Sequence, residues 1–142
     1  MTSKHTTGLE QLELFKGCTT HEFDRIRSLS TLASIPSDTR LTRQGSTGNQ
    51  FVIILSGQVS IQHNGTFIAL AGPGEIIGEI ALLERGEVQR TARTSTPCEL
   101  LVFSATEFST MMTEMPNVAS RVQRIAIHHL LEDENVTSKQ PH

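Results

Sequence analysis

The spacing of hydrophobic residues divides the chain into a helical start, a long strand-rich middle and a helical end. Residues 9–15 and 19–32 carry leucine, isoleucine and phenylalanine three or four positions apart, which predicts two short amphipathic helices. Thr19 or Thr20 is a suitable cap for the second helix, with Glu22 in its first turn. We expect this pair of helices to be structural and to cover one end of a sheet.

From residue 33 onward, short strands alternate with turns rich in glycine, proline and asparagine. Five consecutive apolar residues within 50–56 predict a strand that is buried on both faces. Asn64 and Gly65 tolerate positive φ, so they predict a tight hairpin between 58–63 and 66–71. About eight short strands favour a mainly β fold, a double-stranded β-helix or jelly-roll barrel. The other predicted strands are 34–35, 40–43, 91–95 and 99–103.

Two further helices are predicted after the last strand. Ser104 and Glu107 have capping-box spacing, and Pro116 suits the first turn of a final helix. Val118, Val122 and Ile125 share one side of that helix, which leaves two alternatives open: a homodimer seam, or packing on the protein's own barrel. We expect a disordered N-terminus over 1–8, one folded domain over 9–132 and a disordered polar tail over 133–142.

Length and charge exclude several classes of protein. A chain of 142 residues suits one domain, and a net charge of −3 does not favour direct binding to DNA. No apolar run approaches the roughly 20 residues that span a bilayer, and the polar start lacks the apolar centre of a signal peptide. We therefore expect a cytoplasmic protein with no membrane span. Cys18 and Cys98 are far apart in sequence, which predicts free buried thiols.

Residues 77–92 hold the candidate binding chemistry. Glu79 offers acceptors for a sugar hydroxyl, and Arg90, eleven residues later, offers a planar fork of donors for a phosphate. Gly78 lets the backbone approach a ligand closely, and free amides at the start of a short helix near 80–84 favour an anion. In the alternative interpretation the segment only joins two strands, with Glu79 as a helix-terminal charge and Arg90 as a solvated strand residue.

The same stretch resembles the phosphate-binding cassette of cyclic nucleotide-binding domains. Gly78-Glu79-Ile80-Ala81-Leu82 matches the first half of that cassette, and Arg90-Thr91-Ala92 matches the second. The order of helices and strands from residue 12 to 131 is also similar, most closely to bacterial sensor domains related to catabolite activator protein. Two positions depart from the pattern: Gln89 replaces a frequent proline, and Arg93 should point outward by strand alternation.

The resemblance implies a role for each residue of the cassette. Arg90 would pair with the phosphate oxygens, Glu79 would accept from the ribose 2′-hydroxyl, and the final helix would close over the base. Backbone amides would complete the phosphate site, and Ile77 would contact sugar and base. The predicted ligand-binding set is Ile77, Gly78, Glu79, Ile80, Ala81, Arg90, Thr91 and Ala92.

These observations predict a non-catalytic regulatory module that binds cAMP in preference to cGMP and acts on a downstream protein or a fused effector domain. The eleven residues after Leu131 are too few for the helix-turn-helix that transcriptional relatives append, so we expect no direct DNA binding. A degenerate domain that serves only as an interaction module is one alternative. A cupin-like metal-dependent enzyme is another, but only His63 lies in a predicted strand, and His128 and His129 point about 100° apart.

Overall fold

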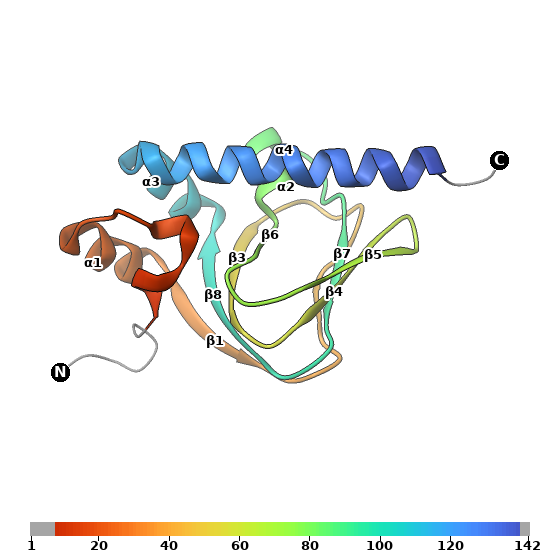
Figure 1. Ribbon diagram of the computed structural model, residues 1–142, viewed down its shortest axis with the longest axis horizontal. Coiled ribbons are helices and arrows are strands. Elements are labelled where there is room, and N and C mark those ends of the chain that lie inside the picture. Colours follow the sequence, from red (N-terminus) through yellow and green to blue (C-terminus); the bar gives the residue numbers. More distant parts are fainter. Residues whose placement is uncertain (1–7, 140–142) are drawn as a thin grey trace.

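The computed structural model describes residues 8–139, and of residues 134–139 the backbone alone. The chain forms two four-stranded sheets that face each other, with helices at one end and along one side (Figure 1). The elements in chain order are η2 (Leu9–Gln11), η3 (Glu13–Phe15), α1 (Thr20–Leu29), β1 (Thr31–Ile35), β2 (Arg40–Thr42), β3 (Gln50–Ser56), β4 (Val59–His63), β5 (Thr66–Ala71), β6 (Ile76–Ile77), α2 (Glu79–Glu84), β7 (Thr91–Thr94), β8 (Cys98–Ser104), α3 (Ala105–Glu114) and α4 (Pro116–Lys139).

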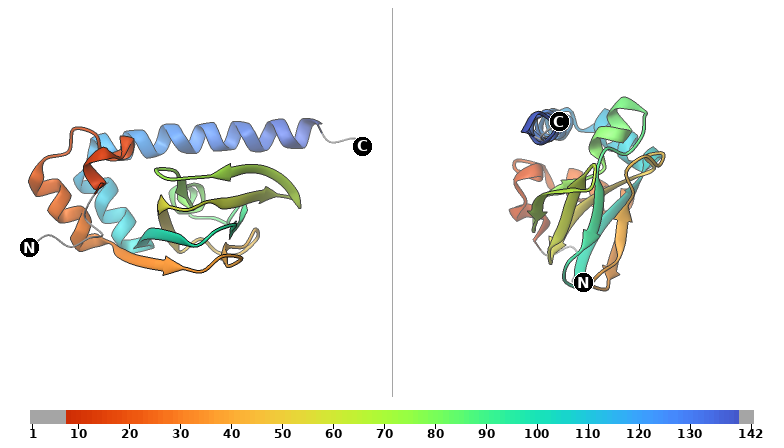
Figure 2. Two further views of the ribbon diagram at one scale, coloured as in Figure 1. Left: turned by 60° about the horizontal axis from the view of Figure 1, so that its bottom comes forward. Right: turned by 90° about the vertical axis from the view of Figure 1, so that its right-hand side faces the viewer.

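The strand order confirms the predicted jelly-roll barrel. One sheet has the order β1-β8-β3-β6 and the other β2-β7-β4-β5, and the strand pairs in both are antiparallel. Apart from the β4–β5 hairpin, consecutive strands therefore pass from one sheet to the other, as in a double-stranded β-helix. The long helix α4 runs lengthwise beside the barrel, as Figure 2 shows, and contacts α2.

Strand β3 explains the continuous apolar run at 50–56, because each of its two faces is buried in a different core. Phe51 and Ile53 pack into a cluster under the helices, whereas Val52 and Ile54 pack into a second cluster between the two sheets. All four residues are at most 4% exposed. The prediction of a strand buried on both faces is therefore confirmed.

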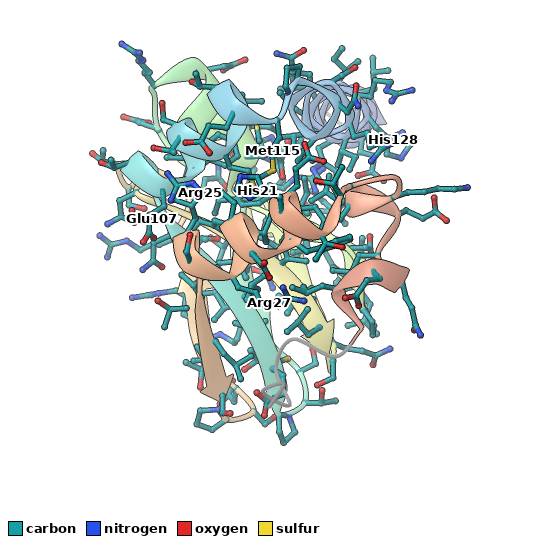
Figure 3. The ribbon with its side chains drawn as sticks, turned by 90° about the vertical axis from the view of Figure 1, so that its left-hand side faces the viewer. His21, Arg25, Arg27, Glu107, Met115 and His128 are labelled. Carbon is teal, nitrogen blue, oxygen red and sulfur yellow. The ribbon has the colours of Figure 1, made fainter. Side chains whose placement is uncertain are left out.

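The helical end of the molecule holds the larger core cluster, seen end-on in Figure 3 with Met115 in its interior. Val118 and Val122 of α4 are fully buried in this cluster, and Ile125 packs against it. These side chains are therefore covered by the protein's own helices and strands. Packing on the protein's own domain is confirmed for Val118 and Val122, and a homodimer through the final helix stays a prediction.

Two predicted helix boundaries differ from the structure. Residues 9–15 form two single-turn 3-10 helices instead of one helix, because Leu12 between them is extended. Helix α1 ends at Leu29, and the predicted helical residues up to 32 enter β1, where Leu32 pairs with Leu101 of β8. Pairing with β8 satisfies the backbone there, which overrides the local helical spacing.

Several local signals are confirmed. The hairpin residues Asn64 and Gly65 have φ of 52° and 77°. Capping boxes form at Thr19 before α1 and at Ser104 before α3, and Pro116 begins α4. Both cysteines are free, with Cys98 buried and Cys18 partly buried.

Helix α4 extends past residue 132, which is the last residue of the predicted folded domain. Helix α4 continues to Lys139, and Asp133, the first residue of the predicted tail, is 7% exposed. Most of the predicted N-terminal tail, residues 1–7, lies outside the described residues. No helix in the described part of the chain is both long and apolar enough to cross a bilayer.

Candidate functional site

The candidate site is a pocket between the inner face of the barrel, the β6–α2 turn and α4. Its empty volume is about 700 Å³, part of which is open solvent. The barrel contributes mainly apolar side chains, among them Ile61, Ala69 and Ala71. Six residues of the predicted ligand-binding set line this one pocket, namely Ile77, Gly78, Glu79, Ile80, Ala81 and Arg90.

Gly78 forms the turn from β6 into α2 and has a φ of 92°. A Cβ atom at this position would lie 2.4 Å from the carbonyl oxygen of Gln50 in β3. Glycine is therefore required here by the left-handed backbone and by the closeness of β3. The structure gives an internal packing reason for this glycine, and its predicted close approach to a ligand stays a prediction.

Glu79 begins α2 and is only 2% exposed. Its Oε2 lies 3.0 Å from Nδ1 of His129 on α4, and because an ionised carboxylate can only accept, the imidazole donates this hydrogen bond. Its Oε1 is buried and has no hydrogen-bond partner among the described residues. A buried acceptor without a donor is unfavourable, and Glu79 is among the residues that line the pocket.

Arg90 lies just before β7 and reaches across to the far end of α4. Its Nε donates to Oδ1 of Asp133 at 3.0 Å, and its Nη2 donates to Oε1 of Glu132 at 3.0 Å. Nη2 also donates to the backbone oxygen of His129 at 2.9 Å. The Arg90 side chain is 13% exposed and that of Asp133 is 9% exposed. Arg90 is thus a partly buried cation that faces anions, and the alternative of a solvated strand residue is wrong.

The structure places the last two members of the predicted set, Thr91 and Ala92, outside the lining of this pocket. The hydroxyl of Thr91 accepts a hydrogen bond from the backbone amide of Gln44 at 3.0 Å. Ala92 is fully buried in the cluster between the sheets. The geometry gives no support to a side-chain contact of Thr91 with a ligand. Arg93 is half exposed and pairs with Asp38, so its predicted outward direction is confirmed.

Sequence reasoning missed the three residues of α4 that contact the predicted ligand-binding pair. Glu132 and Asp133 follow His129 by three and four positions, so the three side chains lie on one face of α4. They are separated from Arg90 by 39 to 43 positions. Their spacing on an amphipathic helix was the available signal, but nothing in the sequence alone indicates which part of the barrel that face covers.

No three His, Cys, Asp or Glu side chains gather into a possible metal site within the described residues. The side chain of His128 is 73% exposed, and its Nε2 lies 3.5 Å from Oε2 of Glu132. Its neighbour His129 is engaged by Glu79. The described part of the chain therefore offers no ligand set for the cupin-like alternative.

Comparison with known proteins identifies the family of this chain. Residues 32–115 match the cyclic nucleotide-binding domain, and since this segment is more than half of the 142 residues, the chain belongs to that family. Among its relatives, the cyclic AMP receptor protein of Thermus thermophilus is 29% identical over 124 residues, which are 84% of this chain and 57% of that protein. The acetyltransferase Pat of Mycolicibacterium smegmatis is 33% identical over 135 residues, 92% of this chain and 40% of that protein.

Solved structures agree with this assignment. The catabolite activator protein of Thermus thermophilus superimposes with a TM-score of 0.74 at 28% identity, covering 88% of this chain and 61% of that one. The regulatory subunit of a cAMP-independent protein kinase A from Trypanosoma brucei shares the fold, with a TM-score of 0.80 at 16% identity. The superposition covers 96% of this chain and 50% of that one. This chain spans 39% to 57% of the length of the first curated relatives.

Proposed function

We propose that this domain is a non-catalytic sensor that binds a cyclic nucleotide in the pocket between α2 and α4, with cAMP favoured over cGMP. The observation that carries the proposal is the convergence of Arg90 and Glu79 in one largely apolar pocket. One residue supplies a cation for a phosphate and the other supplies a buried acceptor for a hydroxyl. A cyclic nucleotide presents both groups on a compact, apolar-faced molecule.

In the proposed complex Arg90 donates to the exocyclic oxygens of the cyclic phosphate, with help from the backbone amides of Ile80 and Ala81. The unpartnered Oε1 of Glu79 accepts from the ribose 2′-hydroxyl. The sugar and base lie against the apolar barrel wall around Ile77. Each charge-assisted hydrogen bond contributes roughly 1.5–3 kcal/mol, and micromolar affinity needs about 8 kcal/mol, so the contacts must act together.

The position of Thr91 supports the preference for cAMP. Its side chain lies outside the pocket lining and its hydroxyl accepts from the Gln44 amide, which favours a site without a hydroxyl contact to a guanine base. The name of the Thermus relative, cyclic AMP receptor protein, supports the same choice. The downstream partner would be another protein or a fused effector domain, because the relatives are longer than this chain.

Calorimetric titration with cAMP, cGMP and 5′-AMP tests the proposal. We expect cAMP to bind more tightly than cGMP, and both cyclic nucleotides to bind more tightly than 5′-AMP, whose doubly charged phosphate does not match a site with one cation. Equal affinity for cAMP and 5′-AMP would contradict recognition of the cyclic phosphodiester.

A degenerate domain that acts only as an interaction module is the second candidate. One observation favours it: the side chains of α4 already satisfy Arg90, so the protein is internally paired without a nucleotide. The absence of any heat of binding with all three nucleotides, at millimolar concentration and in folded protein, would select this second candidate.

A further inference from the structure

A single turn of α4 contacts both residues that the proposed function assigns to the nucleotide. We call His129, Glu132 and Asp133 the polar turn of α4. His129 donates to Glu79, while the carboxylates of Glu132 and Asp133 accept from Arg90. At Arg90 the polar turn matches the nucleotide in kind, because carboxylate oxygens stand where phosphate oxygens would accept. His129 bonds to Oε2 of Glu79 and leaves Oε1 for a ribose hydroxyl.

We propose that the polar turn of α4 is an internal competitor of the nucleotide, so that it sets the affinity of the site and links occupancy to the position of the far half of α4. This inference rests on the proposed function. Its chemistry is that of like charges: a phosphate beside Arg90 would lie next to two carboxylates and would be repelled by them. The cyclic phosphate and the polar turn therefore exclude each other from Arg90.

The packing of α4 shows which part of the helix is free to respond. Val118 and Val122 are fully buried, and Ala126 is 6% exposed, so the first half of α4 is held by the core. Beyond Ala126, the apolar side chains of the described residues point outward, with Ile127 58% and Leu131 54% exposed. Helix α4 also lies close to β5, and the side-chain hydrogen bonds that tie its far half to the rest of the described domain are those to Glu79 and Arg90.

The polar turn is also an incomplete substitute for a ligand. Oδ2 of Asp133 is buried without a hydrogen-bond partner among the described residues, and Oε1 of Glu79 is in the same state. Buried acceptors without donors make an arrangement less stable than a fully paired one. A nucleotide that supplies a hydroxyl to Glu79, and lets Asp133 return to water, removes both defects.

The apparent dissociation constant of a site equals its intrinsic value divided by the fraction of molecules in the competent state. Weakening the internal competitor therefore raises the affinity for the nucleotide. Asp133→Asn combined with Glu132→Gln removes both charges and keeps the size of both side chains. We expect the double variant to bind cAMP at least threefold more tightly than the wild type, with smaller gains in each single variant.

The matched control removes two acidic charges elsewhere. Glu13 in η3 and Glu84 in α2 are exposed, and neither lines the pocket. The Glu13→Gln/Glu84→Gln variant should bind cAMP within twofold of the wild type, which separates competition at Arg90 from a general change in charge. Unchanged or weaker binding by the Glu132→Gln/Asp133→Asn variant would overturn the inference, because it would mean that these carboxylates do not compete or instead support the bound state.

A second measurement needs no nucleotide. Hydrogen exchange of the backbone amides between residues 127 and 133 reports how firmly the far half of α4 is held. In nucleotide-free protein we expect at least tenfold faster exchange in the Glu132→Gln/Asp133→Asn variant than in the wild type or the control. Equal protection in all three proteins would overturn the inference. If no variant binds cAMP, the proposed function fails, and the exchange comparison still decides whether the polar turn holds α4.

Discussion

Replacing Arg90 by alanine is the perturbation whose outcome follows most directly from the structure. In the proposed complex Arg90 provides the cation for the phosphate, and a hydrogen bond between charged partners contributes roughly 1.5–3 kcal/mol. At about 1.4 kcal/mol per tenfold change in affinity, that range corresponds to roughly ten- to a hundredfold. The nucleotide-free protein already uses Arg90 in three hydrogen bonds of 2.9–3.0 Å to α4, which must be given up on binding. The net loss should therefore lie near the lower limit, about tenfold.

Arg93 provides the matched control. It lies three positions further along the chain, is 47% exposed and pairs with Asp38 on the outside of the barrel. Calorimetry with cAMP should show an affinity about tenfold lower for Arg90→Ala and within twofold of the wild type for Arg93→Ala, with thermal melts confirming that both variants are folded. Equal affinities of the Arg90→Ala variant and the wild type would refute the role of Arg90, and equal losses in both variants would point to a general effect of charge.

Three further predictions concern other residues. Glu79→Gln should weaken cAMP binding by about tenfold, since a contact to a charged acceptor contributes roughly 1.5–3 kcal/mol. The ligand 2′-deoxy-cAMP lacks the hydroxyl, so it should bind the wild type and the variant with equal affinity. A difference in affinity that persists with this ligand would contradict the ribose contact. Gly78→Ala should lower the free energy of unfolding by at least roughly 1–2 kcal/mol, which is the cost of placing alanine in the left-handed backbone conformation. Gly72→Ala, which has open space at its Cβ, should change the free energy of unfolding little in denaturant titrations. Similar stabilities of the two variants would contradict the packing described. Burial raises the pKa of the Cys18 thiol, with a smaller contribution from Glu22, so less thiolate is present at a given pH. A colorimetric thiol assay should therefore show Cys18 reacting more slowly than free cysteine, and buried Cys98 reacting only on unfolding; fast reaction of two thiols in folded protein would be incompatible with this core.

The barrel could be predicted from sequence because its signals are local. The apolar run of β3 has no polar position, and a strand enclosed between two cores needs none. Asn64 and Gly65 determine a hairpin through their own backbone preferences. Likewise, each capping box depends on residues three positions apart, such as Ser104 and Glu107. Such features depend on neighbours in the sequence and not on distant partners.

The wrong or missing predictions concern residues whose structure depends on partners far away in the sequence. Residues 31 and 32 continue a helical spacing, but hydrogen bonding to β8 makes them a strand. The cassette pair Glu79 and Arg90 was found by pattern, yet their partners on α4 come from a part of the chain whose polar residues resemble a solvated tail. The direction in which α4 leaves α3 determines that Asp133 is buried, and no local rule encodes that direction.

The packing of α4 suggests how binding would be read by another protein. The first half of this helix is held in the core, and the far half depends on contacts to the two residues assigned to the nucleotide. A ligand shifts an equilibrium only by its differential affinity for the two states, and here that difference arises at Glu79 and Arg90. Coupling between two ligands is reciprocal. If cAMP raises the affinity of a downstream protein for the released half of α4, that protein would raise the affinity of the site for cAMP by the same factor.

The central claim is that a cyclic phosphodiester binds at Arg90 and Glu79, and a crystal structure with cAMP tests it most directly. The account predicts Arg90 nitrogens about 2.7–3.2 Å from exocyclic phosphate oxygens, the Glu79 carboxylate at the same range from the 2′-hydroxyl, and Asp133 no longer paired with Arg90. A structure that contains cAMP elsewhere, with Arg90 still bound to Asp133 and Glu132, would contradict it.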